Sequence, residues 1–266
     1  MKLFLFLFLF ILILILIYYY LINIYCNTSI DYFIYKSPDF NELEDKTIMI
    51  ISGTHGNEPA GYYAISDLIN NLKNQKLKLQ KCKFILVPGV NYCALKLNMR
   101  SVPLIGDLNR KYPVDINDIT CNKINKKIID LGKDADFILD FHEGWGFHRQ
   151  NSKSIGSTLT TTNTELSQNL SFLIVDNLNK TINLEYKKFK VLTNDENLIK
   201  ENSYIYGKNE NIKGTLLYYE TIMNKNYILV ETTGQNNIQP LKIRINQINF
   251  IIDYILKYFN CKKIDF

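Results

Sequence analysis

The sequence predicts one α/β domain with a largely parallel sheet, preceded by an N-terminal transmembrane helix. Three observations support this. The first residues form a long segment without charge, four short apolar runs rich in β-branched residues follow along the chain, and amphipathic stretches separate these runs. The chain is 47% hydrophobic and 21% charged, a balance that excludes a disordered chain, which needs low hydrophobicity and high charge.

The N-terminal segment, residues 3–25, contains only uncharged and mostly aliphatic or aromatic side chains. A helix needs about 20 apolar residues to cross the hydrocarbon core of a membrane. No Ala-x-Ala-like cleavage site follows, so we interpret residues 1–26 as an uncleaved signal-anchor, with a cleaved signal peptide and a secreted protein as the alternative. Lys2 precedes the segment and acidic residues follow it, which places the remaining domain, residues 27–266, on the lumenal or extracellular side.

The predicted sheet consists of four apolar runs. They are TIMIIS (47–52), KFILVP (83–88), DFILDF (136–141) and YILVET (227–232). Such runs are typical of strands that are buried on both faces of a parallel sheet. Helices are predicted between and after them, over 59–73, 116–131, 164–179 and 240–259, and residues 193–215 are polar enough to predict a long loop.

Charge and cysteine usage exclude other classes of protein. The net charge is +5, but no Lys/Arg stripe with interleaved aromatic residues occurs, which argues against nucleic-acid binding. The five cysteines show no Cys-x-x-Cys spacing, which argues against a zinc knuckle or a redox pair. In an oxidising compartment, Cys82 and Cys93 are candidates for a disulfide, subject to geometry.

Polar side chains follow the predicted strands at the edge where ligands bind in open α/β sheets. His55 and Glu58 come after the first strand, His142 after the third, and Glu231 at the end of the fourth. The chain has three histidines in all, and two of them occupy these positions.

This combination predicts a metal site. Catalytic zinc uses three His, Asp or Glu ligands and keeps a fourth position for water, and His55, Glu58 and His142 provide such a set for one Zn²⁺ ion. Gly53 and Gly56 allow the tight turn around His55, and Asp140 is a candidate for orienting an imidazole. A single His-x-x-Glu would more simply be a helix cap beside a satisfied polar residue, but the whole constellation favours the metal.

Four motifs in order, GTHGNEPAG, GDLNRKYP (106–113), DFH (140–142) and VET (230–232), resemble the zinc carboxypeptidase superfamily, including its succinylglutamate desuccinylase/aspartoacylase branch. The resemblance implies a three-layer α/β/α fold around a mixed, largely parallel sheet. It implies His55, Glu58 and His142 as zinc ligands. It further implies Glu231 as general base, Arg100 as the residue that polarises the scissile carbonyl, and Asn109 with Arg110 as the clamp for a substrate carboxylate.

The chemistry of these residue types agrees with the implied roles. A carboxylate beside the metal can take a proton from water and return it to the leaving amine, and a guanidinium suits both an oxyanion and a bidentate grip on a carboxylate. Each of these residues has a simpler alternative: Arg110 could pair with Asp107, Glu231 could be a capped strand-end residue, and Arg100 lies in a loop, residues 91–106, that offers no rigid registration. The substrate-covering tyrosine of the superfamily has four candidates here, Tyr204, Tyr206, Tyr218 and Tyr219.

The functional prediction is therefore a zinc-dependent, metallocarboxypeptidase-like hydrolase. It would cleave an amide (peptide) bond adjacent to a free carboxylate in a small peptide, while anchored to a membrane by its N-terminal helix. The alternative is an N-acyl-amino-acid deacylase, for which the substrate is an acyl-amino acid. A third hypothesis is a non-catalytic binding module on the same fold.

Overall fold

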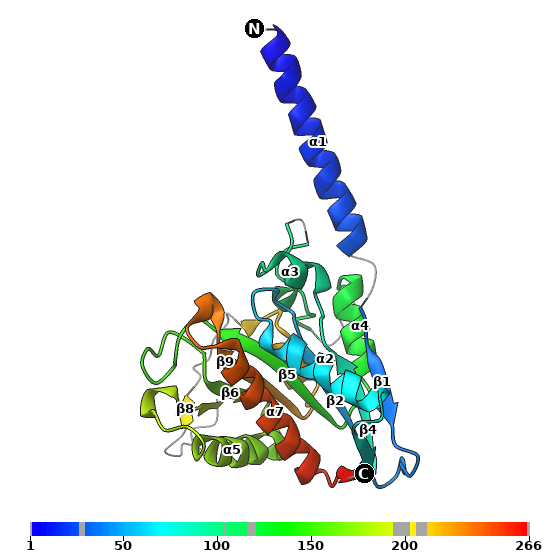
Figure 1. The fold of residues 1–266 in the computed structure, drawn as a ribbon, viewed down its shortest axis with the longest axis vertical. Helices are drawn as coiled ribbons and strands as arrows, with labels where there is room; N and C mark the ends of the chain where they lie inside the picture. Colours follow the sequence, from blue (N-terminus) through cyan, green and yellow to red (C-terminus); the bar gives the residue numbers. More distant parts are fainter. Residues whose placement is uncertain are drawn as a thin grey trace.

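The computed structural model describes residues 2–26, 30–103, 105–115, 121–193, 203–205 and 212–264. Within these residues, a mixed eight-stranded sheet forms the centre of the body, and helices lie on both of its faces (Figure 1). The predicted three-layer α/β/α arrangement is confirmed.

The sheet has the strand order β1-β4-β2-β5-β9-β6-β7-β8. Its neighbours pair in parallel except for β1 with β4 and β6 with β9. The strands are β1 (Phe33–Lys36), β2 (Lys46–Ser52), β4 (Cys82–Val87), β5 (Phe137–Gly144), β6 (Thr158–Thr161), β7 (Lys190–Thr193), β8 (Ser203–Ile205) and β9 (Tyr227–Thr233). A separate antiparallel pair consists of β3 (Lys78–Gln80) and β10 (Lys262–Ile264).

The described residues also form helices and short turns. The α-helices are α1 (Lys2–Cys26), α2 (Ala60–Lys73), α3 (Tyr92–Leu97), α4 (Lys123–Gly132), α5 (Glu165–Asn179), α6 (Leu216–Ile222) and α7 (Leu241–Tyr258). Short 3₁₀ turns occur at η1 (Leu108–Arg110), η2 (Glu185–Lys187) and η5 (Gln235–Asn237).

Two apolar cores, one on each face of the sheet, hold the layers together. Alternate residues of β2 point to opposite faces, so that Ile48 and Ile50 belong to one core and Met49 and Ile51 to the other. The first core is closed by α2, α5 and α7, and the second by α3, α4 and α6. Because the central strands are buried on both faces, their sequences are continuous apolar runs rather than alternating ones.

Helix starts follow the capping residues. Thr164 precedes α5 and accepts a hydrogen bond from the Ser167 backbone, in agreement with the predicted start. The helix expected over 116–131 begins later, because the Asn122 side chain accepts hydrogen bonds from the backbone N–H groups of Ile124 and Asn125 at the start of α4. Residues 116–120 lie outside the described part of the chain, as does most of the predicted loop over 193–215.

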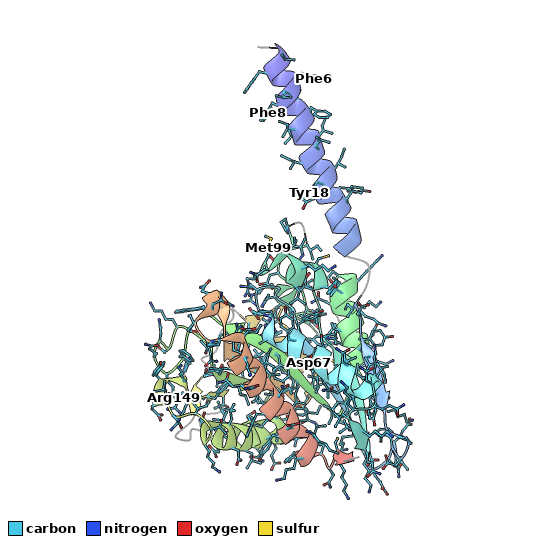
Figure 2. The ribbon with its side chains drawn as sticks, in the orientation of Figure 1. Phe6, Phe8, Tyr18, Asp67, Met99 and Arg149 are labelled. Carbon is cyan, nitrogen blue, oxygen red and sulfur yellow. The ribbon has the colours of Figure 1, made fainter. Side chains whose placement is uncertain are left out.

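The N-terminal segment forms the helix α1, which extends away from the body (Figure 1). Its described side chains are exposed, among them Phe6, Phe8 and Tyr18 (Figure 2). No helix among the described residues combines the length and the apolar character that are required to cross a membrane. The transmembrane helix predicted over residues 1–26 is therefore not found.

The proposed Cys82–Cys93 bridge is also wrong. Cys82 has a free thiol that is buried at the start of β4, where its backbone N–H is bonded to the Ser37 hydroxyl. It lies in the apolar core together with Cys261, which is also free.

Candidate active site

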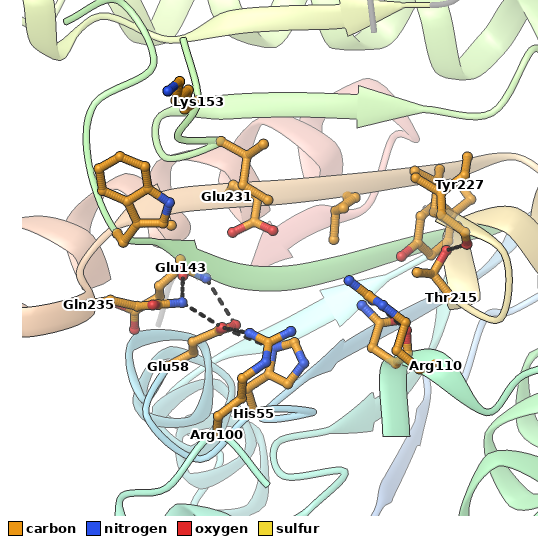
Figure 3. Close-up of a pocket in the computed structure, with 17 residues that line it drawn as sticks. His55, Glu58, Arg100, Arg110, Glu143, Lys153, Thr215, Tyr227, Glu231 and Gln235 are labelled. Atoms are coloured by element: carbon orange, nitrogen blue, oxygen red, sulfur yellow. Dashed lines mark hydrogen bonds and ion pairs between the residues drawn. The ribbon is translucent and has the colours of Figure 1, made fainter. Parts of the chain in front are cut away.

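The predicted site residues come together at the carboxyl edge of the sheet. His55 and Glu58 lie in the turn between β2 and α2, whereas His142 and Glu231 lie on the neighbouring strands β5 and β9, directly opposite each other in register. A pocket of about 280 Å³ opens above them, and His55, Glu58 and Glu231 line it (Figure 3).

Two glycines shape the turn that carries His55 and Glu58, as the sequence predicted. Gly53 has a φ of +67°, in the left-handed region that favours glycine. Gly56 packs so closely against α3 that a Cβ atom would lie 1.9 Å from the backbone of Ala94. Larger residues at either position would displace the histidine.

His55, Glu58 and His142 form a compact, buried cluster. The Glu58 carboxylate lies 2.9 Å from each histidine, with Oε1 facing His55 Nδ1 and Oε2 facing His142 Nδ1, and the two Nδ1 atoms are 3.2 Å apart. Zinc–ligand distances of about 2.0–2.1 Å in a tetrahedron separate neighbouring ligand atoms by about 3.3–3.4 Å. The three side chains therefore have the chemistry, and nearly the spacing, that one metal ion requires.

Each histidine also has a carboxylate beside its other ring nitrogen. Asp140 Oδ2 lies 3.4 Å from His142 Nε2, and Asp107 Oδ1 lies 3.1 Å from His55 Nε2. Such outer carboxylates orient imidazoles toward a metal. The prediction for Asp140 is confirmed in its position, whereas the contact of Asp107 was not predicted.

The cluster is electrostatically coupled. Burial alone would raise the pKa of Glu58, but the charge of His55 and the hydrogen bonds from both histidines outweigh it and hold the pKa well below its usual range. Burial alone would lower the pKa of His142. The neighbouring Asp140 and Glu58 carboxylates outweigh burial and hold this pKa well above its usual value. Because metal ligands must be deprotonated, binding of a metal ion at this cluster would compete with protons.

Glu231 lies on the other side of the pocket from Glu58 and His55, and its carboxylate points toward them (Figure 3). The residue is only 5% exposed, and burial raises its pKa well above the usual value. Among the described residues, none forms a hydrogen bond with this carboxylate. Its oxygens are therefore available to a substrate or a water molecule.

Arg100 approaches the cluster from outside. Its Nε and Nη2 atoms donate to Asp107 Oδ2 at 3.2 and 2.9 Å, and Nη1 lies 3.5 Å from Glu58 Oε1. The side chain is 45% exposed. Asp107, which the sequence offered as a partner for Arg110, thus pairs with Arg100 and His55 instead.

Asn109 and Arg110 lie in η1 and both line the pocket. Asn109 Oδ1 accepts a hydrogen bond from the Leu216 backbone at 3.0 Å and thereby connects η1 to α6. Arg110 is exposed and donates to the carbonyl of Asn109 at 2.7 Å, which leaves most of its donors directed to solvent or the pocket.

Other pocket residues were not assigned from the sequence as site residues. They include Lys153, Trp145, Tyr227 and Gln235. Tyr227 donates to Asp140 Oδ2 at 2.8 Å, behind His142. Of the four tyrosine candidates, Tyr218 and Tyr219 do not line the pocket, while Tyr206 and the side chain of Tyr204 lie outside the described residues.

The chain thus combines an α/β/α fold with a His/Glu/His cluster at the carboxyl edge of its sheet. Residues 44–156 match the family model of the succinylglutamate desuccinylase/aspartoacylase catalytic domain. The resemblance seen in the sequence is thus confirmed, and the family is one of hydrolases. No curated protein matches the chain.

Solved structures share the fold at low sequence identity. The cell shape determinant protein Csd4 from Helicobacter pylori superimposes with a TM-score of 0.69 at 20% identity, over 89% of this chain and 57% of that one. Another structure of that protein is described as a D,L-carboxypeptidase. A succinylglutamate desuccinylase/aspartoacylase from Rhodobacter sphaeroides gives a TM-score of 0.57 at 18% identity, over 88% and 60% of the respective chains. The present chain thus spans less than two thirds of these relatives.

Proposed function

We propose that the protein is a zinc-dependent hydrolase that cleaves an amide bond adjacent to a free carboxylate, in the manner of a metallocarboxypeptidase. One observation carries the proposal. Two members of the buried His55–Glu58–His142 cluster, His55 and Glu58, line a pocket that also presents Glu231 and Arg110 (Figure 3). A metal site, a base and a carboxylate-binding group are the three parts that such a reaction needs.

The choice of zinc follows from the ligand types. Two imidazole nitrogens and one carboxylate oxygen form the three-ligand set that is typical of catalytic zinc, and both histidines are backed by carboxylates. When bound there, zinc would polarise the scissile carbonyl and lower the pKa of water toward about 7.

The residues of the chain would supply the remaining chemistry. The Glu231 carboxylate would accept a proton from the attacking water and return it to the nitrogen of the leaving amine. Arg100 would donate to the developing oxyanion, which requires it to turn from Asp107, and its exposed position leaves room for this movement. Arg110 and Asn109, which line the same pocket, would bind the substrate carboxylate.

An N-acyl-amino-acid deacylase is the second candidate. The match to the desuccinylase/aspartoacylase family model favours it, whereas the likeness to a structure described as a D,L-carboxypeptidase favours the peptidase. The two activities share the same chemistry and differ in what lies on the acyl side of the bond. A binding module without catalysis is less well supported, because every residue type that the reaction needs faces the pocket.

The test combines metal analysis with parallel assays. Purified protein should contain one zinc per chain by elemental analysis, and it should hydrolyse either C-terminal dipeptides or N-acyl amino acids, with activity lost on chelation and restored by zinc. Absence of stoichiometric zinc, together with an unchanged His55→Ala variant, would refute the proposal. The lumenal or extracellular location stays a prediction, which mass spectrometry of the mature N-terminus and protease protection would test.

A further inference from the structure

Gln235 contacts a candidate metal ligand from outside the cluster. It is the first residue of η5, directly after β9 and Gly234, and its amide lies at the edge of the pocket (Figure 3). The Nε2 atom donates to Glu58 Oε1 at 2.9 Å and to the carbonyl oxygen of Glu143 at 2.7 Å. Both partners are acceptors, so the nitrogen end of the amide must face them.

The contacts of Glu58 fall into two groups. Those from His55 and His142 come through the Nδ1 atoms, which are the atoms that would bind a metal, and they would be given up as the metal replaces their protons. Among the described residues, the remaining donors are Gln235 Nε2, the backbone N–H of Glu143 at 3.2 Å, and Arg100 at 3.5 Å. Since Arg100 is half-exposed and bonded to Asp107, Gln235 is the close side-chain donor that stays.

The turn that carries Gln235 is built tightly against β5. The Gly234 backbone N–H donates to the Gly144 carbonyl at 3.1 Å, and a Cβ atom at Gly234 would lie 1.5 Å from Glu143 Oε2. That carboxylate is itself fixed by a buried ion pair with Arg244 and by the Ala60 backbone N–H at the start of α2. Gln235 is therefore held in place by the same strand that carries His142.

We propose that Gln235 is a positioning residue that orients the Glu58 carboxylate for metal binding. The inference rests on the metal site proposed above. It goes beyond that proposal because it assigns part of the zinc affinity of the site to a residue that is not a ligand. A neutral amide suits this role because it donates a hydrogen bond without adding charge. The Lewis acidity of the metal is then left intact.

The test is the affinity for zinc, measured on full-length protein by competition with a chromophoric chelator. Gln235→Met keeps the length of the side chain and removes the donor, and we expect it to weaken zinc binding by about 10- to 100-fold, as is typical for an outer partner of a ligand. Asn236→Gly is the matched control, since it removes a neighbouring exposed amide at a φ of +60°, which glycine adopts freely. Its affinity should stay within twofold of wild type.

Each result separates the positioning role from the metal site itself. If the wild type binds one zinc and Gln235→Met binds it equally well, the role of Gln235 is refuted while the metal site stands. If the wild type binds no zinc, both are refuted. Thermal melts of the metal-free proteins establish folding. Should Gln235→Met fail to fold, Gln235→Asn, whose amide is one methylene too short to reach Glu58, is judged by the same criterion.

Discussion

Replacing Glu220 with glutamine should stabilise the protein at neutral and alkaline pH. Glu220 lies on α6, is 4% exposed, and burial raises its pKa from 4.5 to about 7, with Lys225 opposing and nearby Asp140 adding to the shift. A carboxyl whose pKa is raised by folding is bound to a proton more tightly in the folded state. The folded state is therefore destabilised at pH values where this carboxyl must ionise.

The size of the effect follows from the shift. A difference of about 2.5 pKa units corresponds to about 3 kcal/mol of unfolding free energy, all of which is lost above pH 7. The loss begins near pH 4.5, reaches about 2 kcal/mol at pH 6, and is complete by about pH 8. Because the glutamine side chain has no charge at any pH, Glu220→Gln should gain this amount relative to wild type.

Urea unfolding of both proteins at pH 4.5, 6 and 8.5 measures the gain. We expect the two to be nearly equal at pH 4.5 and the variant to be about 3 kcal/mol more stable at pH 8.5. Glu44→Gln, at an exposed position, is the control and should show no comparable pH-dependent gain. A constant difference across the range, or a less stable Glu220→Gln at pH 8.5, would refute the argument.

Three predictions concern the site. Glu231→Gln should retain zinc but lower kcat by about 10²- to 10⁴-fold, because the proton acceptor is lost; wild-type turnover in this variant would contradict the mechanism. In the wild-type enzyme, kcat/KM should fall as pH decreases through the raised pKa of Glu231, because a protonated carboxyl accepts no proton; a rate that rises toward acid pH would count against it. Arg110→Lys should raise KM about tenfold or more with kcat less affected, because a planar guanidinium binds a carboxylate through two hydrogen bonds and an ammonium group does not. The control Arg149→Lys, which lies away from the pocket, should leave KM unchanged.

The central part of the fold could be predicted because the sequence pattern there has one physical cause. Strands β2, β4, β5 and β9 are buried on both faces, and such strands must be continuously apolar. Strand β6, which lies between β9 and β7, was missed because its sequence, TLTT, is short and has three threonines, yet all four residues are buried. Its antiparallel pairing with β9 depends on the tertiary structure, which no local pattern encodes.

The candidate ligands could be predicted for a related reason. Residues that follow the carboxyl ends of neighbouring parallel strands lie at the same edge of the sheet. His142 and Glu231 are paired in register on β5 and β9, and His55 follows the neighbouring strand β2. Their positions in the sequence relative to the strand ends were therefore enough to predict that they lie close together. Asp107 and Gln235 obey no such rule. Asp107 reaches His55 across 52 residues from a 3₁₀ turn, and Gln235 reaches Glu58 across 177 residues.

The residues that were missed therefore have a different part in the site from those that were found. Residues at strand ends supply the atoms that would bind the metal, and their positions are set by the sheet. The outer partners that were missed, Asp107 and Gln235, come from turns whose paths depend on local packing, such as the close approach of Gly234 to Glu143. The candidate ligands could thus be predicted from the sequence, whereas the contacts of Asp107 and Gln235 that would orient them form only when the loops have folded onto the sheet.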